Sequence, residues 1–161
     1  MCDICNGKTP RQARRDLEDS IEEYGWALQY VESAVDEHGV HPAFCYTVGL
    51  TALGCEELVI TGRVMEQSAE VLNTLAERIW DGGEFTAGER VGAGGLDLCM
   101  VPVRECEGWL LTAKRLYGDG NVRAVQAVWA DCDGLLPWEG AITSTIVQPL
   151  LGLPPGGRIA S

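Results

Sequence analysis

The sequence predicts an α+β fold, in which a mostly antiparallel sheet of about six strands packs with two or three helices in one domain. Two blocks rich in β-branched and aromatic residues, 44–50 and 58–61, flank a short glycine-containing connection and read as neighbouring strands. Apolar residues repeat at helical spacing over 65–79. The expected order, α-β-β-β-α-β-β-α-β, lacks the regular alternation of a doubly wound parallel sheet. A barrel-like sheet is a variant of this prediction.

The first helix is expected over 10–24. Thr9 can cap it, Pro10 has no amide to leave unpaired at the first position, and Gln12 stands where a capping-box partner belongs. Gly25 is suited to end the helix. A narrow apolar stripe follows helical spacing between these signals: Leu17, Ile21 and Tyr24.

The remaining elements follow from alternation, helical spacing and glycine signals. They are expected in this order: strand 26–35, loop 36–42, the central strand pair, helix 65–79 ended by Gly82 and Gly83, strands 84–91 and 96–103 around a glycine-rich hairpin turn at 92–95, a short helix over 107–117, and a last main strand at 122–129. Residues 1–140 are expected to form the domain. Residues 141–161, punctuated by three prolines, are expected to be an extension that packs on the domain and has a loose end.

The first block of the central pair has two different faces. Phe44, Tyr46 and Val48 alternate with Cys45, Thr47 and Gly49, so that one face is large and apolar. We expect this apolar face to pack against the helix at 65–79. The Thr47 and Gly49 face has two interpretations: another backbone approaches closely at Gly49, or the face lines a ligand cavity.

Charge and composition exclude several classes of protein. The 161-residue chain has a formal charge of −12, and its twelve Lys and Arg residues are scattered, which argues against nucleic-acid binding. No apolar run approaches the ~20 residues that cross a bilayer, and the N-terminus lacks a signal-peptide core, so we expect a cytoplasmic protein with mostly reduced thiols. Acidic residues concentrate over 16–37, which either attract a basic partner or form a solvated face.

Five segments resemble a known family, the bacterial domain of unknown function numbered 4262. They are MCDIC at the start, EYGWALQYV (23–31), AFCYTVGL (43–50), ELVITG (57–62) and AVQAVWADCDGLLPW (124–138). The resemblance implies a compact cytoplasmic domain of actinobacteria and their phages, and it implies no reaction. Where members often show Gly-His-Pro-Glu-Leu, this chain has Gly-Cys-Glu-Glu-Leu at 54–58, so the histidine is replaced by Cys55. Residues 141–161 lie outside the pattern.

One constellation has the ligand types of a zinc site. Cys2 and Cys5 form a CxxC, and His38 and His41 form an HxxH, which together offer two thiolates and two imidazoles. The two pairs are far apart in sequence, and no βαβ context of a thioredoxin-like redox motif follows the cysteines. We therefore favour packed or idle thiols over a structural zinc or a redox role, and we expect no metal.

Two further groups are candidate pockets. Gln126, Trp129, Asp131 and Trp138 could form a polar pocket, together with Asp133 and Glu139, or an Asp-rich turn under an aromatic lid. Trp26, Tyr46 and Thr47 could form the floor of a small-ligand cavity in a barrel-like sheet, with a flavin or haem suggested by analogy of fold alone.

The sequence favours a binding or regulatory protein over an enzyme. It has many core-forming aromatic residues, only two histidines, and no nucleophile elbow, nucleotide fingerprint or metalloprotease helix. We expect it to act through a protein partner, which the charge suggests is basic, or through a small ligand. The competing class is a cofactor carrier or enzyme with a split-barrel fold. The sequence leaves the oligomeric state open.

Overall fold

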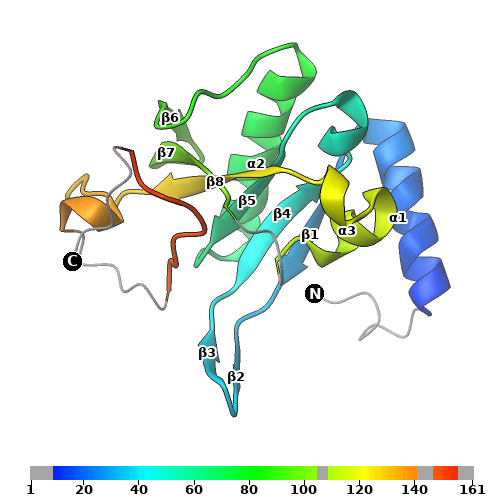
Figure 1. Cartoon of the computed structure of the whole chain (residues 1–161), viewed down its shortest axis with the longest axis horizontal. Helices are drawn as coiled ribbons and strands as arrows, with labels where there is room; N and C mark the ends of the chain where they lie inside the picture. The colour runs from blue at the N-terminus through cyan, green and yellow to red at the C-terminus, as the bar shows by residue number, and fades with distance from the viewer. Residues whose placement is uncertain (1–8, 105–108, 141–146, 156–161) are drawn as a thin grey trace.

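Six strands form one open sheet in the computed structural model, which describes residues 9–104, 109–140 and 147–155 (Figure 1). In spatial order they are β1 (Ala27–Val31), β4 (Phe44–Val48), β5 (Glu57–Thr61), β8 (Ala124–Trp129), β7 (Leu96–Pro102) and β6 (Arg90–Ala93). Only β5 and β8 run parallel, and the other four neighbouring pairs are antiparallel. The predicted α+β class is confirmed. The barrel-like variant is wrong, because β1 and β6 remain at opposite edges of the sheet.

The described residues form three α-helices beside the sheet: α1 (Pro10–Tyr24), α2 (Met65–Trp80) and α3 (Leu111–Tyr117). The capping box predicted for α1 is present, since the Thr9 hydroxyl accepts from the Gln12 amide and the Gln12 side chain accepts from the Thr9 amide. Gly25 ends α1 at a φ of 97°, in the left-handed region that favours glycine. None of the helices in the described ranges is long and apolar enough to span a membrane.

The helices cover both faces of the sheet (Figure 1). On one face, α2 packs its buried residues on alternate side chains of β4, β5 and β8, among them Cys45, Ile60 and Ala127. On the other face, α1 and α3 cover the intervening residues, including Tyr46 and Val48. The expectation that Phe44, Tyr46 and Val48 face α2 is therefore wrong. The alternation was read correctly, but both faces are covered, so alternation could not tell which helix lies on which face.

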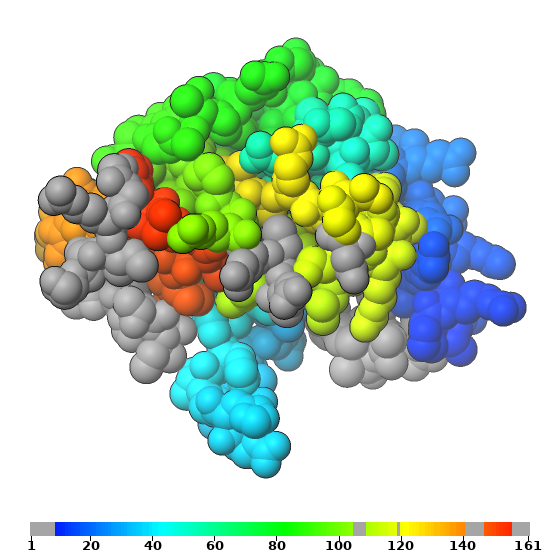
Figure 2. Space-filling model, in the orientation of Figure 1, coloured from blue at the N-terminus to red at the C-terminus, as the bar shows by residue number. Residues whose placement is uncertain are grey.

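A two-stranded hairpin, β2 (Ala34–Asp36) and β3 (Gly39–His41), projects away from the sheet (Figures 1 and 2). The prediction of one strand over 26–35 and a loop over 36–42 is wrong here. Every residue of β2 and β3 is exposed, and their central valines, Val35 and Val40, lie opposite each other. Strands of three exposed residues have no buried face, so they leave no burial pattern in the sequence.

Gly49 lies where two backbones meet. Its φ is 130°, and a Cβ built on it would lie 2.8 Å from the carbonyl oxygen of Gly25 and 2.9 Å from the Cα of Trp26. Any larger residue would push the end of α1 away from β4. The interpretation that Gly49 marks a close backbone approach is thus confirmed.

The second half of the sheet follows the prediction with one shortened strand. β6 begins at Arg90 instead of residue 84, because residues 86–89 form a turn. In this turn the Glu89 amide donates to the Thr86 carbonyl, and the Thr86 amide donates to the Glu89 carboxylate. Gly94 and Gly95 make the predicted hairpin turn, with φ values of 58° and 77°. A short helix was expected over 107–117, of which residues 107–108 lie outside the described residues. In the structure α3 begins at Leu111.

The C-terminal segment (147–155) lies on the same face as α1 and α3, where Leu150 and Leu151 join the apolar clusters. Gln148 fixes it to β8, because its side-chain amide accepts from the Trp129 amide at 2.8 Å and donates to the Trp129 carbonyl at 3.0 Å. A side chain here completes the hydrogen bonds that a neighbouring strand would make. The segment is thereby held by polar contacts as well as by apolar ones.

Candidate functional site

A groove of about 740 Å³ runs along the outer edge of β1, between α1 and α2. We call it the β1 groove. Its floor is β1 from Ala27 to Gln29, and its walls carry polar and aromatic side chains: Asp16, Ser20 and Tyr24 from α1, Trp26 at the start of the strand, and Asn73 and Glu77 from α2. The groove exists because β1 is the edge strand of the sheet, and α1 and α2 lie on opposite faces of the sheet. The edge of β1 is therefore exposed between the two helices.

The aromatic end of the β1 groove is held in place by defined contacts. The indole Nε1 of Trp26 donates to Asn73 Oδ1 at 2.9 Å, which ties the strand to α2. The Trp80 ring lies 6.1 Å from the Trp26 ring at an interplanar angle of 54°. It also covers Gly25 so closely that a Cβ there would lie 2.3 Å from a ring carbon. Gly25 is therefore required by its φ and by the tryptophan packed on it.

The backbone of β1 offers hydrogen-bonding groups to this groove. β1 pairs with β4 along its whole length, from Ala27 opposite Val48 to Val31 opposite Phe44, and with no other described strand. In an antiparallel ladder, alternate residues direct their N–H and C=O groups away from the partner strand. An open sheet edge of this kind can accept one more extended chain.

The charge of the β1 groove is negative. Its lining includes the carboxylates of Asp16 and Glu77 and contains no Lys or Arg. Further carboxylates lie on the exposed surface of α1. One of them, Glu18, is paired with Arg14 at 3.0 Å. The groove is therefore suited to a basic chain and disfavours an acidic one.

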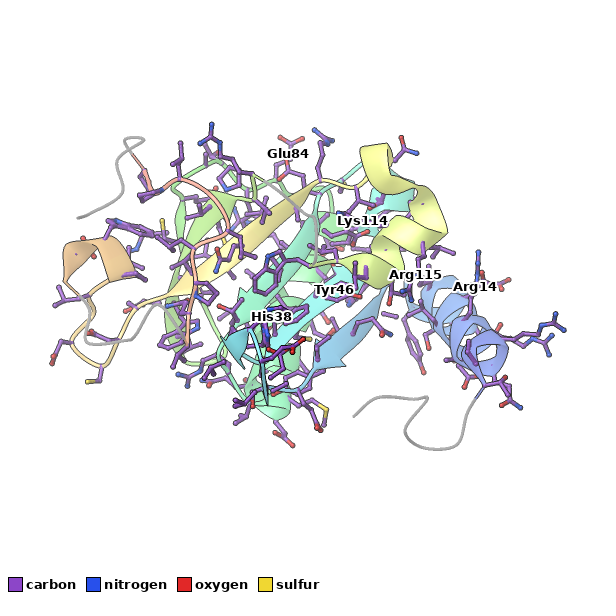
Figure 3. The ribbon with its side chains drawn as sticks, turned by 60° about the horizontal axis from the view of Figure 1, so that its bottom comes forward. Arg14, His38, Tyr46, Glu84, Lys114 and Arg115 are labelled. Carbon is purple, nitrogen blue, oxygen red and sulfur yellow. The ribbon has the colours of Figure 1, made fainter. Side chains whose placement is uncertain are left out.

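Trp26, Tyr46 and Thr47 lie in different parts of the structure. Trp26 lines the β1 groove, whereas Tyr46 is buried between the sheet and α3 (Figure 3), where its hydroxyl accepts from the Thr112 amide at 3.0 Å. Burial raises the pKa of the Tyr46 hydroxyl. Thr47 is also buried, and its hydroxyl accepts from the Leu58 amide where the regular β4–β5 ladder ends.

Sequence reasoning missed the most polar buried site in the described chain, which is centred on Glu57. The carboxylate of this fully buried residue accepts from the hydroxyls of Thr47 and Thr51 at 2.8 and 2.5 Å. It also accepts from the amides of Gly49, Leu50 and Thr51 at 2.9 to 3.3 Å. Four of these five donors belong to the turn after β4, and the fifth, the Thr47 hydroxyl, belongs to β4 itself. Glu57 therefore fixes that turn to the strand and leaves little capacity for a ligand.

Gln126 and Trp129 are engaged by the chain itself. The Gln126 side chain donates to the Pro149 carbonyl at 2.8 Å and accepts from the Leu151 amide at 2.9 Å. The Trp129 indole donates to the Thr61 carbonyl at 2.7 Å, and the Arg63 guanidinium lies 4.7 Å from its ring centroid. These contacts use both residues to hold the C-terminal segment and the end of β5.

Asp131 and Trp138 form the turn and the lid that the sequence offered as the alternative to a pocket. Asp131 Oδ1 accepts from the amides of Asp133 and Leu135 at 2.9 and 3.0 Å, and Gly134 closes the turn at a φ of 78°. Trp138 is half-buried against the cluster that contains Leu136. Neither residue lines the β1 groove.

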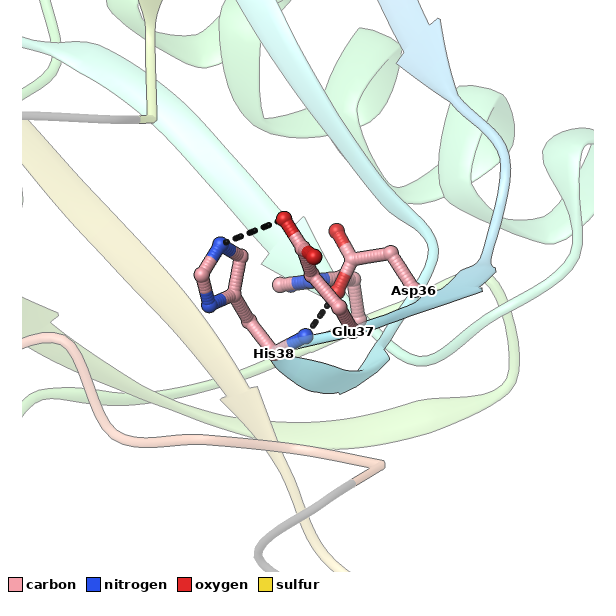
Figure 4. A network of polar contacts seen from close by, with 4 residues as sticks. Asp36, Glu37 and His38 are labelled. Carbon is pink, nitrogen blue, oxygen red and sulfur yellow. Dashed lines mark hydrogen bonds and ion pairs between the residues drawn. The ribbon is translucent and has the colours of Figure 1, made fainter.

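The two histidines lie on the projecting hairpin, His38 in its turn (Figure 4) and His41 at the end of β3. His41 Nε2 is 3.0 Å from Asp36 Oδ1, and His38 Nε2 is 3.6 Å from Glu37 Oε1. Hydrogen bonds from His41 and from the His38 amide lower the pKa of the Asp36 carboxyl. Cys2 and Cys5 lie outside the described residues. In the part of the chain that is described, no three His, Cys, Asp or Glu side chains gather as metal ligands.

The cysteine thiols differ in accessibility, which leads to a first prediction. Burial raises the pKa of the Cys45 thiol to about 12 and also raises that of Cys99, whereas Cys132 is exposed. Alkylation requires the thiolate. We expect iodoacetamide at about pH 8, near the ordinary thiol pKa, to modify Cys132 well before Cys45 and Cys99. Peptide mass spectrometry over time measures this order, and in urea all three should react alike. Equal rates in the folded protein would contradict the burial described here.

The sequence pattern of a domain family, the domain of unknown function DUF4262, matches residues 20–143. The chain belongs to this family. The DUF4262 match contains every strand of the sheet and leaves out the N-terminal MCDIC segment, which the resemblance had included. The stretch at 54–58 that departs from the expected family pattern leads into β5 and contains Glu57. No curated protein and no solved structure matches the chain.

Proposed function

We propose that this member of the DUF4262 family is a non-catalytic protein-binding domain, which holds an extended, basic segment of a partner protein in the β1 groove. The observation that carries this proposal is the open edge of β1 between two helices, because an added strand would find backbone hydrogen bonds on one side and helix walls above and below. A cytoplasmic location and a basic partner protein are parts of this proposal.

The charges of the β1 groove support a basic occupant. Asp16 and Glu77 stand on opposite walls, so a strand lying between them would meet a carboxylate on each side. Trp26 and Tyr24 add apolar surface at the same end, and such aromatic side chains commonly anchor bound peptides. The expected ligand therefore alternates apolar residues with Lys or Arg.

The test uses a display library of random linear peptides, selected on the folded protein. We expect basic peptides to be enriched, and binding of a selected peptide, measured by fluorescence anisotropy, to weaken as salt rises from about 0.05 to 0.5 M. N-methylation of alternate backbone amides of that peptide should abolish binding, because an added strand needs its N–H groups.

Charge reversal locates the site. Asp16→Lys together with Glu77→Lys should weaken peptide binding by roughly tenfold or more, the range of effect seen when charges of one sign are placed together at an interface. Glu22→Lys together with Glu23→Lys is the matched control, since it changes the net charge equally on exposed α1 residues outside the groove. If both double variants bind equally well, or if no basic peptide is enriched, the proposal is wrong.

A further inference from the structure

A second pocket, of about 250 Å³, lies on the α2 side of the sheet, where β5 and β8 begin. We call it the Arg123 pocket. Its floor is apolar and buried, made by Leu58, Val125 and Ile79. Three charged residues, Glu56, Glu84 and Arg123, line it from three different segments. It shares no lining residue with the β1 groove.

The charged side chains of this pocket are unpaired within the described ranges of the chain. Glu56, Glu84 and Arg123 make no ion pair and no side-chain hydrogen bond there. Nearby Arg78 behaves differently, since its guanidinium is bonded to Glu89 at 2.7 Å and lies 4.6 Å from the Phe85 ring centroid. Charges of both signs thus surround the Arg123 pocket without neutralising one another. Figure 3 shows the Glu84 side chain at the surface of the molecule.

We propose that the Arg123 pocket binds a small zwitterion with an apolar body, of the class of the aliphatic α-amino acids. The Arg123 guanidinium would hold the carboxylate of the ligand, for which its planar fork is suited. The ammonium group would lie toward Glu56 and Glu84, and the aliphatic side chain would lie on Leu58, Val125 and Ile79. The volume fits a ligand of this size, because pockets for drug-sized molecules begin at about 300 Å³.

The mixed charges select against other small ligands. A simple anion that approached Arg123 would also meet two carboxylates, and a simple cation near Glu56 and Glu84 would meet the guanidinium. Only a ligand that carries both charges satisfies all three side chains. The buried floor adds a preference for aliphatic over polar side chains, since removal of apolar surface from water is favourable.

The experiment measures the thermal midpoint of the protein with leucine, valine or methionine at up to roughly 10 mM, because a ligand of so few atoms has limited affinity. We expect these amino acids to raise the midpoint, whereas 3-methylbutylamine, 4-methylpentanoate and serine at the same concentration should not. Calorimetric titration with the best ligand should give one site per chain.

Substitution of the charges completes the test. Arg123→Gln and Glu84→Gln should each weaken binding of that amino acid by about tenfold or more, as expected when a charge-assisted hydrogen bond is lost. Arg115→Gln, at an exposed position of α3 on the other face, should bind like the unsubstituted protein. No shift with any aliphatic amino acid, equal shifts with the amine or the acid, or unaltered binding by Arg123→Gln would overturn the proposal. None of these outcomes depends on peptide binding at the β1 groove.

Discussion

Replacement of Glu57 by alanine should lower the free energy of unfolding by about 3–5 kcal/mol, because several buried donors lose their acceptor and each costs ~1–3 kcal/mol when unsatisfied. Three backbone amides and two threonine hydroxyls converge on this carboxylate. Without it, these groups lose the acceptor that they have in the described structure. Equilibrium unfolding in urea, followed by tryptophan fluorescence, measures the loss.

Two control substitutions show whether the loss of stability comes from the Glu57 carboxylate: one keeps the shape of the side chain without its charge, and the other changes the neighbouring residue. Glu57→Gln keeps the volume and one acceptor oxygen but places an amide N–H₂ among donors, so a smaller loss, still above ~1 kcal/mol, is expected. Glu56→Gln alters the preceding residue, whose side chain makes no hydrogen bond in the described structure, and should stay within ~0.5 kcal/mol. Equal urea midpoints for Glu57→Ala and Glu56→Gln would show that the carboxylate does not organise the turn.

Truncation of Leu72 to alanine should cost about 2–5 kcal/mol, the range observed for buried leucines. Leu72 is fully buried on α2, within the cluster that joins this helix to β4, β5 and β8. The loss of stability combines the transfer free energy of the removed isopropyl group with the cost of the cavity that it leaves. A denaturant midpoint shifted downward, with an unchanged slope, is the expected result.

Glu70→Ala on the same helix is the control for Leu72→Ala. Glu70 is exposed, and alanine has a high helix propensity, so this change should alter stability by less than ~0.5 kcal/mol. Leu75→Ala, at a residue that is 3% exposed, should behave like Leu72→Ala. If neither leucine substitution moved the midpoint, α2 would not be packed on the sheet as described.

Sequence reasoning succeeded where one segment contains the whole signal. The capping box at Thr9, the terminating Gly25 and the apolar spacing of α2 are local features, and each was confirmed. The close approach at Gly49 was also predicted, because glycine in a strand usually marks such a position. The projecting hairpin was missed, since its exposed strands of three residues carry no burial pattern.

The candidate sites were harder to predict because their parts are distant in sequence. The β1 groove combines α1, β1 and α2, and Trp26 was the only residue of its lining that had been singled out for a pocket. Glu57 was passed over because three of its donors are backbone amides, which have no side-chain signature. Gln126 and Trp129 were recognised as polar groups on a strand, but only the fold reveals that Pro149 and Thr61 are their acceptors.

The single parallel pair of the sheet has a consequence for how the chain folds. β1, β4 and β5 form one antiparallel unit, β6, β7 and β8 form another, and only the β5–β8 ladder joins them. Within each unit the paired residues are closer in sequence, from Ala93 opposite Leu96 to Leu98 opposite Trp129, whereas the joining ladder sets Glu57 opposite Ala124. Closure of so long a loop is entropically unfavourable until its contacts form. The rate-limiting step of folding is therefore expected to be the meeting of two preformed halves, with α2 as the link between them.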